Sequence, residues 1–380
     1  MMISPEQLPL DVEQFWKDDA RAHEDNCFSK KAPQAALGIR MSDECVFAEL
    51  NEPGDPWGHT PPARRLELNR RYNDKAEKLV GIRLLSESAD PEDAAFPAVK
   101  RIGEVFGGTY HFGQETGEWL SGTVSNPSEL EALLDQVDQL DLEDFMLPSN
   151  WPAEKKRIAQ LYGKKPQQLR HVRGPVTLAA SIFGVENLIY LYYDAPELFS
   201  RFSETIGRVI VDMSRIMDRE AGYSEGKAPS GFSFADDDCC LLTPDMYEMF
   251  GFPVLKKIFD RFCPDISDMR YQHSDSDMAH LLPLLGKLNL TGCNFGPTVL
   301  IDQIRVYMPR TRIDGCLAPF TFMYNDPDAI AAEVRRDLQM IKQDGSRGLN
   351  LSTAGSINNG SRLESMRLIM ALIQNEGRYL

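Results

Sequence analysis

RIDGCLAPFTFMYNDPDAIAAEVRRDLQMIK, residues 312–342, joins a strand-like stretch to a helical one. Apolar residues in its second half recur at spacings of 4, 4 and 3, which is one face of a 3.6-residue period: Ile330, Val334, Leu338 and Ile341. Asp326 offers an N-cap for this helix, and Pro327 suits its first turn. The stretch therefore predicts a strand followed by a short loop and an amphipathic helix.

The same rhythm recurs along the C-terminal half of the chain. PDISDMRYQHSD, LTGCNFG and GLNLSTAGSI each predict a strand, and each precedes a segment with helical periodicity. Upstream, QQLRHVRGPVTLAASIFG and SGFSFADDDCCLLTPDMYEMF have the same pattern, so about six βα units follow residue 167. Repeated βα units predict a parallel sheet with helices outside it, and this number favours an eight-stranded barrel. An open doubly wound sheet is the alternative, because periodicity does not reveal closure.

We therefore expect an α/β protein built as a (β/α)8 TIM barrel with an irregular N-terminal extension. Residues 1–100, which include the loop-like NEPGDPWGHTPPARR, form the expected extension and pack on the barrel. Residues 101–380 form the expected catalytic barrel. The two parts are expected to make one structural domain, and the sequence does not distinguish a monomer from a homodimer.

The amino-acid composition indicates which partners and which cellular compartment to expect for this protein. The 380 residues are 42% hydrophobic and 26% charged, with a formal net charge of −16, so we expect neither nucleic acid nor an anionic membrane as a partner. The chain shows no apolar run long enough to span a membrane, and its start lacks a secretory pattern. Seven cysteines without a CxxC pair argue against disulfides and zinc ribbons, which favours a cytoplasmic protein with reduced thiols.

Polar residues follow several successive predicted strands, where the catalytic residues of a βα barrel lie. These strand ends are Arg173-Gly174-Pro175, Asp236-Asp237-Asp238, His273-Ser274-Asp275, Asn294-Phe295-Gly296, Cys316 and Ser352-Thr353. A structural role is the simpler hypothesis for each: a histidine or cysteine is often buried, and an aspartate often caps a helix. We interpret His273 and Asp275 as site residues, with Asp277 capping the helix that begins near Met278.

Several of these blocks resemble the uroporphyrinogen decarboxylase superfamily. The resemblance rests on RGPVTLAASIFG, FADDDCCLLTPDMYEMFGFPVLKKI, QHSDSDMAHLLPLL, IDGCLAPFTFMYNDPDAIAAEV and GLNLSTAGSINNGSRLESM, in that order over roughly residues 165–380. It implies a (β/α)8 barrel, in agreement with the repeated units. The superfamily contains decarboxylases and cobalamin-linked methyltransferases.

The sequence departs from the true decarboxylases at two places. Their arginine-rich RQAGR-like stretch has no counterpart in APQAALGIRMSDE, which offers Arg40 alone. Their histidine in the last strand's loop is also missing, because this chain has TAGSINNGS there. Both differences argue against a porphyrinogen substrate.

The resemblance also implies a metal site. Methyltransferases that act on coenzyme M bind zinc with a His-x-Cys pair and a later cysteine, whereas this chain has His273-Ser274-Asp275 at the pair position. The loss of soft ligands argues against a thiol acceptor. His273 and Asp275 are still candidate zinc ligands, with Cys316 as the first choice for the third ligand and Asp237 as the second.

Branches with His-Ser-Asp resemble the first enzymes of corrinoid-dependent demethylation. The resemblance implies transfer of a methyl group from a small-molecule donor, such as a methoxylated aromatic, to cobalamin carried by a partner corrinoid protein. His273, Asp275 and Asp237 are the candidate catalytic residues, because a metal or acid must stabilise charge on the leaving oxygen. The candidate substrate-binding residues are Arg173, Phe234, Asn294, Phe295 and Phe320, with Phe322 beside them.

Two rival functions stay open at this point. A metal-independent decarboxylase of a small acid would use the same aspartates and Arg173. A non-catalytic ligand-binding barrel is less favoured, because it has no need for acids and a histidine at several strand ends. Metal content and dependence on a corrinoid partner distinguish the three hypotheses.

Overall fold

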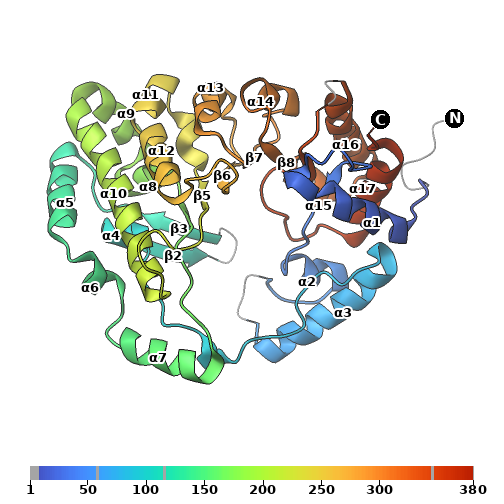
Figure 1. Cartoon of the computed structure of the whole chain (residues 1–380), viewed down its shortest axis with the longest axis horizontal. Helices are drawn as coiled ribbons and strands as arrows, with labels where there is room; N and C mark the ends of the chain where they lie inside the picture. The colour runs from blue at the N-terminus through green and yellow to red at the C-terminus, as the bar shows by residue number, and fades with distance from the viewer. Residues whose placement is uncertain (1–7, 57–59, 114–116, 344–345, 380) are drawn as a thin grey trace. The chain divides into compact units, whose positions relative to one another are not determined.

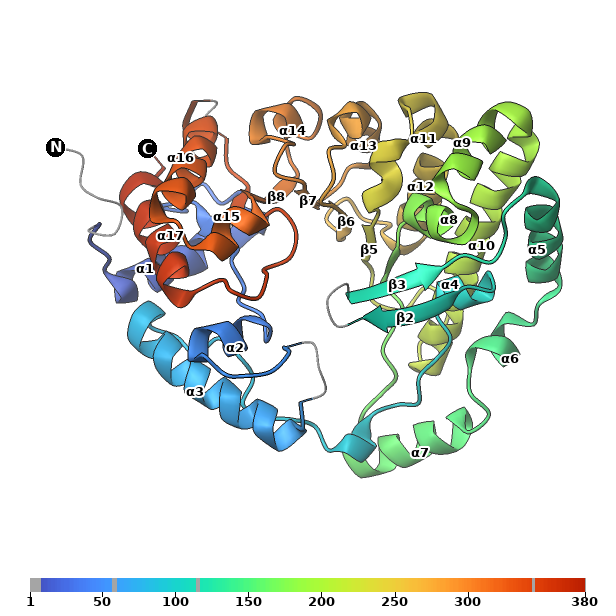
Figure 2. The ribbon, with the colours of Figure 1, turned by 180° about the vertical axis from the view of Figure 1, so that it is seen from behind.

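The structure is a computed structural model that describes residues 8–56, 60–113, 117–343 and 346–379 (Figures 1 and 2). It is a mixed α/β protein. Its main sheet has seven strands in the order β1-β9-β8-β7-β6-β5-β4, and a separate antiparallel hairpin is formed by β2 and β3. The neighbouring strands from β4 to β6, and from β7 through β8 and β9 to β1, run parallel, as the repeated βα units predict.

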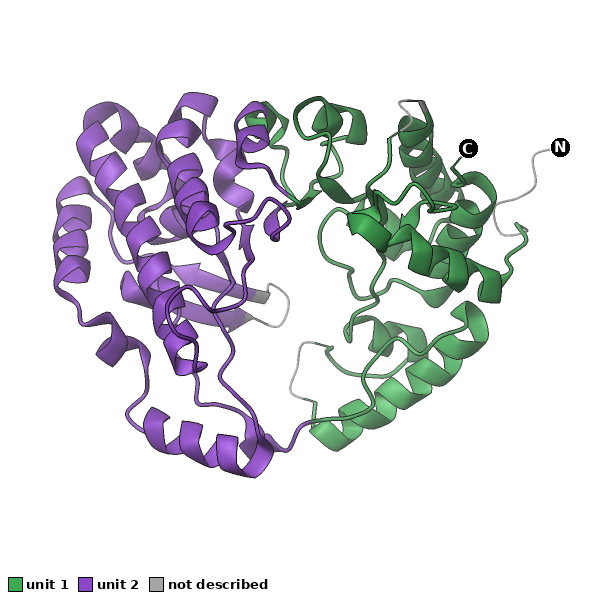
Figure 3. Ribbon diagram, in the orientation of Figure 1, with its two compact units in different colours: residues 1–89, 274–282, 291–380 green, residues 90–273, 283–290 purple. Residues whose placement is uncertain are grey.

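The chain divides into two compact units (Figure 3). Unit 1 comprises residues 1–89, 274–282 and 291–380, and unit 2 comprises residues 90–273 and 283–290. In unit 1, β1 pairs in parallel with β9 through Ala36 and Leu37, so the expected N-terminal extension contributes a strand to the sheet. The boundary that we expect at residue 100 stays a prediction.

Unit 1 contains four strands of the main sheet, β1, β7, β8 and β9, and the helices near both ends of the chain. Its elements are α1 (Val12–Ala22), η2 (Glu24–Cys27), β1 (Ala36–Leu37), α2 (Cys45–Leu50), α3 (Pro62–Val80), η5 (Ala279–Leu281), β7 (Gly292–Phe295), α14 (Ile301–Tyr307), β8 (Arg312–Leu317), α15 (Pro319–Tyr324), α16 (Pro327–Gln343), β9 (Leu349–Thr353) and α17 (Leu363–Glu376).

Unit 2 contains the hairpin and the strands of the candidate site. Its elements are η3 (Glu92–Ala94), α4 (Ile102–Val105), β2 (Thr109–Gly113), β3 (Gly117–Ser121), α5 (Pro127–Gln139), α6 (Leu142–Met146), α7 (Trp151–Tyr162), β4 (His171–Arg173), α8 (Pro175–Phe183), α9 (Val185–Asp194), α10 (Pro196–Glu220), β5 (Phe232–Ala235), η4 (Asp237–Leu241), α11 (Pro244–Met249), α12 (Gly251–Phe262), β6 (Arg270–Ser274), α13 (Leu282–Leu285) and η6 (Gly286–Leu288).

The helix predicted from residues 312–342 is α16, and its apolar stripe is buried as expected. Ile330, Val334, Leu338 and Ile341 are each at most 2% exposed. The Asp326 carboxylate accepts hydrogen bonds from the backbone N–H groups of Asp328 and Ala329, which confirms the predicted N-cap. α16 packs beside α17, whose buried face closes this part of the core (Figures 1 and 2).

In unit 2 the long helix α10 packs against α12. Its buried residues include Phe202, Ile206 and Val209, spaced as an amphipathic helix requires. The rings of Phe199 and Phe202 lie 4.8 and 5.6 Å from the ring of Phe250, which comes between α11 and α12. This apolar layer supports the strands on their helix-facing side.

The helix predicted to begin near Met278 is interrupted in the structure. The segment MAHLLPLLGKL forms the short turns η5, α13 and η6, because Pro283 and Gly286 both weaken a continuous helix. Met278, and not Asp277, occupies the N-cap position there, so the expected capping role of Asp277 is wrong. The acidic stretch 126–148 divides into α5 and α6, and Asp141 caps the second of these through the N–H of Asp144.

No single helix in the described part of the chain is long and apolar enough to cross a membrane. Only α8 and α9 taken together have sufficient length and apolar composition, and they bend by 99° at their junction.

Candidate functional site

Two rows of side chains on one face of the sheet cross β4, β5 and β6. Arg173 is in register with Ala235, and Ala235 with His273. His171, Ser233 and Tyr271 form the next row in the same way. Because side chains alternate along each strand and paired residues share a face, His273 and Arg173 lie on one face, two strands apart. The C-terminal ends of β5 and β6 therefore present His273 together with the acidic residues that follow β5.

The histidine meets an acidic neighbour at these strand ends. His273 Nε2 lies 3.8 Å from Asp237 Oδ1, and the two side chains are 26% and 41% exposed. Asp275 follows His273 by two residues. Asp237, His273 and Asp275 each offer one ligand atom, and these atoms all lie within 4.8 Å of one another. One imidazole and two carboxylates are a donor set that suits zinc or another divalent transition metal.

Asp236, directly before this group, is fully buried. One of its carboxylate oxygens accepts a 2.8 Å hydrogen bond from the N–H of Thr177 at the start of α8. The other oxygen is buried without a hydrogen-bond partner among the described residues. Burial raises the pKa of Asp236 to about 7, against the lowering effect of the Thr177 hydrogen bonds. Asp236 therefore connects the end of β5 to α8, and the side chain of the next residue, Asp237, lies close to His273.

Gly174 makes this close approach possible. A Cβ atom at residue 174 would lie 2.1 Å from the Cβ of Asp236, a separation that real atoms do not adopt. The Gly174 N–H also donates to the Ala235 carbonyl at 2.7 Å. The glycine of the RGP sequence at the end of β4 is thus explained by the tight contact with the end of β5.

A cavity of about 290 Å³ lies within unit 2 beside β4. It is lined by three basic residues, Lys100, Arg101 and Arg173, by one acid, Glu118, and by His171 and an apolar wall. Arg101 lies over the Tyr110 ring, with its guanidinium carbon 3.3 Å from the ring centroid, and also pairs with Glu118 at 2.6 Å. Burial lowers the pKa of His171, and the nearby His273 lowers it further. A cavity with this lining suits a small molecule that carries a carboxylate.

Arg173 itself is half-buried in this cavity. Its Nη1 donates to the Ser181 hydroxyl at 3.2 Å. Its charge lowers the pKa of Asp238, although burial is the larger effect and the net pKa of Asp238 is raised. Arg173 therefore links the cavity to the acidic turn after β5.

Cys316, the first choice for the third metal ligand, is not part of the group formed by His273, Asp275 and Asp237. Cys316 is buried beside Asp337 of α16, whose carboxylate lies 3.4 Å from the Cys316 N–H. Burial and the Asp337 charge raise the pKa of the Cys316 thiol well above its ordinary value, and this opposes the thiolate that a metal would need. Asp237, the second choice, takes the third position instead.

Asn294 lies at the end of β7 and is tied to the backbone of its neighbours. Its Nδ2 donates to the carbonyls of Asp314 and Thr353, and its Oδ1 accepts from the N–H of Gly355 at 3.1 Å. Asn294 is 7% exposed and connects the end of β7 to the middle of β8 and the end of β9. Its role in substrate binding stays a prediction.

The four phenylalanines expected near the mouth differ in exposure. Phe234 is fully buried, with its ring 5.1 Å from the ring of Phe232 and 5.5 Å from the ring of Phe259 on α12, so it faces the helix layer. Phe295 and Phe322 are also buried. Phe320 is 60% exposed and stacks on Tyr324 at 6.3 Å. Of these rings, Phe320 alone is accessible to a ligand in the structure as described.

Two features of the site could not be predicted from the sequence. The anchoring role of Asp236 depends on a neighbour, Thr177, that lies 59 residues away along the chain. The basic residues Lys100 and Arg101 join Arg173 from a segment without regular secondary structure. The alternation of β4 could have suggested His171, because it shares the face of Arg173.

Residues 95–375 match the family model described as uroporphyrinogen decarboxylase (URO-D). The chain belongs to the uroporphyrinogen decarboxylase family. The match covers the strands β4 to β9 and the segment that supplies Lys100 and Arg101, so the candidate site lies wholly within the URO-D region. The resemblance inferred from the sequence blocks is confirmed, and with it the barrel-type α/β fold of this family.

A solved structure of a methyltransferase from Methanosarcina mazei is similar to this URO-D chain, with a TM-score of 0.54 and 15% sequence identity. The similarity covers 96% of this chain and 99% of the other chain. At this level of identity it supports the fold alone. A comparison with curated proteins finds no match.

Proposed function

We propose that this URO-D protein is a methyltransferase that moves a methyl group from a methylated small molecule to a corrinoid protein. The donor that we favour is a methoxylated aromatic, and the acceptor is cobalamin carried by the partner. The observation that carries the proposal is the group of Asp237, His273 and Asp275 at the ends of β5 and β6. Family membership and the fold shared with a methyltransferase support it.

These three side chains fit a catalytic zinc ion. Three protein ligands with one further position for water or substrate are the usual arrangement of such a site. When bound there, zinc would act as a Lewis acid toward the ether oxygen of the donor. The Asp237 and Asp275 carboxylates would balance the charge of the ion, and their exposure leaves the site accessible from solvent.

The remaining task of the chain is to bind and orient the donor. An ether methyl is a poor electrophile because an alkoxide or phenolate must leave, so charge on the leaving oxygen has to be stabilised. Arg173 lies on the same sheet face as His273 and supplies a cation for a carboxylate on the donor. Phe320 offers an accessible ring for an aromatic donor.

A decarboxylase of a small carboxylic acid is the second candidate. The basic lining of the 290 Å³ cavity favours it, because Lys100, Arg101 and Arg173 suit a carboxylate substrate without a metal. In that case Asp237 would serve in acid-base chemistry and His273 would hold its carboxylate in place.

Metal content is the first test of the proposal. We expect the purified wild-type chain to contain about one zinc ion per chain, and the His273→Ala and Asp237→Ala variants to lose it. His111→Ala is the matched control, because His111 is an exposed histidine on β2 that pairs with Ser121. A wild-type chain reconstituted with zinc that still binds none would remove the Lewis-acid hypothesis and favour the decarboxylase.

Methyl transfer is the second test. The chain is mixed with a methoxylated benzoate and a corrinoid protein held in its reduced state, and the demethylated phenol is measured with the change in the corrinoid spectrum. We expect turnover by the wild type, and a loss of at least about 100-fold in His273→Ala. Release of carbon dioxide from the benzoate without methyl transfer would instead establish the decarboxylase.

A further inference from the structure

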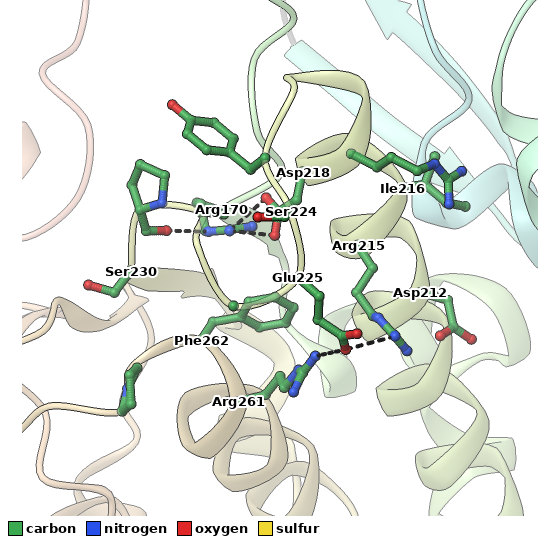
Figure 4. A pocket seen from close by; sticks show the side chains of 16 residues that line it. Arg170, Asp212, Arg215, Ile216, Asp218, Ser224, Glu225, Ser230, Arg261 and Phe262 are labelled. Carbon is green, nitrogen blue, oxygen red and sulfur yellow. Dashed lines mark hydrogen bonds and ion pairs between the residues drawn. The ribbon is translucent and has the colours of Figure 1, made fainter.

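A cavity of about 550 Å³ lies within unit 2, away from the candidate active site (Figure 4). Its walls come from Arg170 directly before β4, the second half of α10, the loop that precedes β5, and the end of α12. All of these segments lie at the N-terminal ends of their strands. Asp237 and His273 lie at the C-terminal ends of β5 and β6, so the cavity and the active site are at opposite ends of these strands.

The cavity is lined by many charged side chains. Its charged residues are four arginines and three acids: Arg170, Arg215, Arg219, Arg261, Asp212, Asp218 and Glu225. Arg219 also pairs with Glu143, which lies outside the lining, so the charges around the cavity nearly balance. Guanidinium groups around a cavity are typical of sites that bind carboxylate or phosphate.

Arg170 belongs to the fixed wall of the cavity. Its Nη2 meets both carboxylate oxygens of Asp218, at 2.7 and 2.8 Å, and its Nε donates to the Pro229 carbonyl. Its guanidinium also lies over the Phe262 ring, 4.8 Å from the centroid. With these partners satisfied, Arg170 shapes the cavity and leaves ligand binding to other arginines.

Arg215 and Arg261 instead converge on a single carboxylate oxygen. Their Nη2 atoms lie 2.9 and 2.7 Å from Oε1 of Glu225, and Figure 4 shows the two side chains reaching Glu225 from different helices. The side chains of Arg215, Arg261 and Glu225 are 50%, 43% and 66% exposed, so these ion pairs contribute little to stability. One carboxylate thus faces two guanidinium groups and balances one of their two charges.

The two arginines and the glutamate differ in how firmly they are held. Arg215 and Arg261 project from α10 and α12, which pack against each other. Glu225 lies on a loop between Gly222 and Gly226, both with positive φ and with open space where a Cβ would be. Glu225 can therefore leave while the arginines stay in place.

We propose that this cavity binds the phosphate group of a small phosphorylated molecule between Arg215 and Arg261, and that Glu225 holds the phosphate position until the ligand displaces it. A phosphate dianion balances both guanidinium charges, whereas the Glu225 carboxylate balances one. The cavity is larger than a phosphate group requires, and Tyr223, Ile216 and Phe262 line the space for the organic part of the ligand.

The test is titration of the full chain with inorganic phosphate, followed by calorimetry in a buffer of low chloride. We expect one saturable site in the wild type. Glu225→Gln removes the competing charge and should bind phosphate about tenfold more tightly, while Arg215→Gln and Arg261→Gln should each bind at least about tenfold more weakly. Arg208→Gln is the matched control, because Arg208 is a half-buried arginine of α10 that pairs with Asp138 outside the cavity.

A gain of affinity in Glu225→Gln cannot come from a damaged fold, so it keeps the test independent of any unfolding in the arginine variants. Equal phosphate binding by the wild type, Glu225→Gln and Arg261→Gln would overturn the proposal. So would the absence of phosphate binding, or tighter binding of acetate than of phosphate at the same site. Metal content and methyl transfer do not enter this readout, so it stands apart from the proposed function.

Discussion

His23 shows how a single residue can make stability depend on pH. Its Nε2 forms an ion pair with Asp19 Oδ2 at 3.4 Å, and its Nδ1 lies 3.8 Å from the Cys27 sulfur. The pairing with Asp19 is the larger cause, and the contact with Cys27 the next, of a pKa raised from 6.5 to about 10. The folded chain therefore retains the His23 proton over a pH range in which the unfolded chain releases it.

This linkage predicts the pH range in which His23 stabilises the fold. A raised pKa stabilises the folded state fully below the unfolded value of 6.5, and the effect is lost as the pH rises through about 10. We expect His23→Gln to lower the free energy of unfolding by about 1–2 kcal/mol at pH 6, and by much less at pH 10. Urea unfolding at several pH values measures the difference, with His111→Gln as a control on an exposed histidine. A difference that grows with pH would contradict the assignment.

Gly174 and Gly207 allow a matched prediction at the scale of the element. A Cβ at residue 174, at the start of α8, would collide with Asp236 after β5. A Cβ at residue 207, inside α10, would meet Lys257 at an ordinary 3.5 Å. We expect Gly174→Ala to destabilise the protein by about 1–3 kcal/mol, and Gly207→Ala to stabilise it by about 0.5–1 kcal/mol because alanine favours a helix. Thermal unfolding of the two variants measures both effects. Equal shifts of the unfolding temperature would show that the Asp236 contact is not tight.

The elements that the sequence predicts best are those with long apolar stripes. α16 and α17 follow from their periodicity because burial of one face decides their position. The continuous helix predicted after β6 is wrong, because Pro283 and Gly286 interrupt the helix although the apolar spacing continues.

At the site, the predicted strand ends indicate His273, Asp275 and Asp237, but they also indicate Cys316 and Phe234. Contacts with α16 and α12 separate these two residues from the site, and such contacts depend on packing that no local pattern specifies.

At the scale of the whole molecule, the division into two compact units was not predictable from periodicity. One boundary falls within β6, where Arg270 to His273 belong to unit 2 and Ser274 belongs to unit 1. Composition does not mark this point, because the strand pattern continues across it. What the composition does specify is the charge, with 57 acidic residues against 41 basic ones.

That charge predicts how the molecule responds to salt. Salt weakens exposed ion pairs such as Lys17–Glu13, each of which contributes little to the free energy of unfolding. Salt also screens the repulsion among the 16 excess acids, and this repulsion acts over the whole surface. We expect the second effect to dominate, so that the free energy of unfolding in urea rises by about 1 kcal/mol between about 20 and 300 mM NaCl. A fall over this range would mean that the ion pairs stabilise the fold more than the net charge destabilises it. The buffer has to be free of phosphate. Phosphate bound to the folded chain between Arg215 and Arg261, as we propose, would raise the free energy of unfolding by mass action, and this increase would look like an effect of salt.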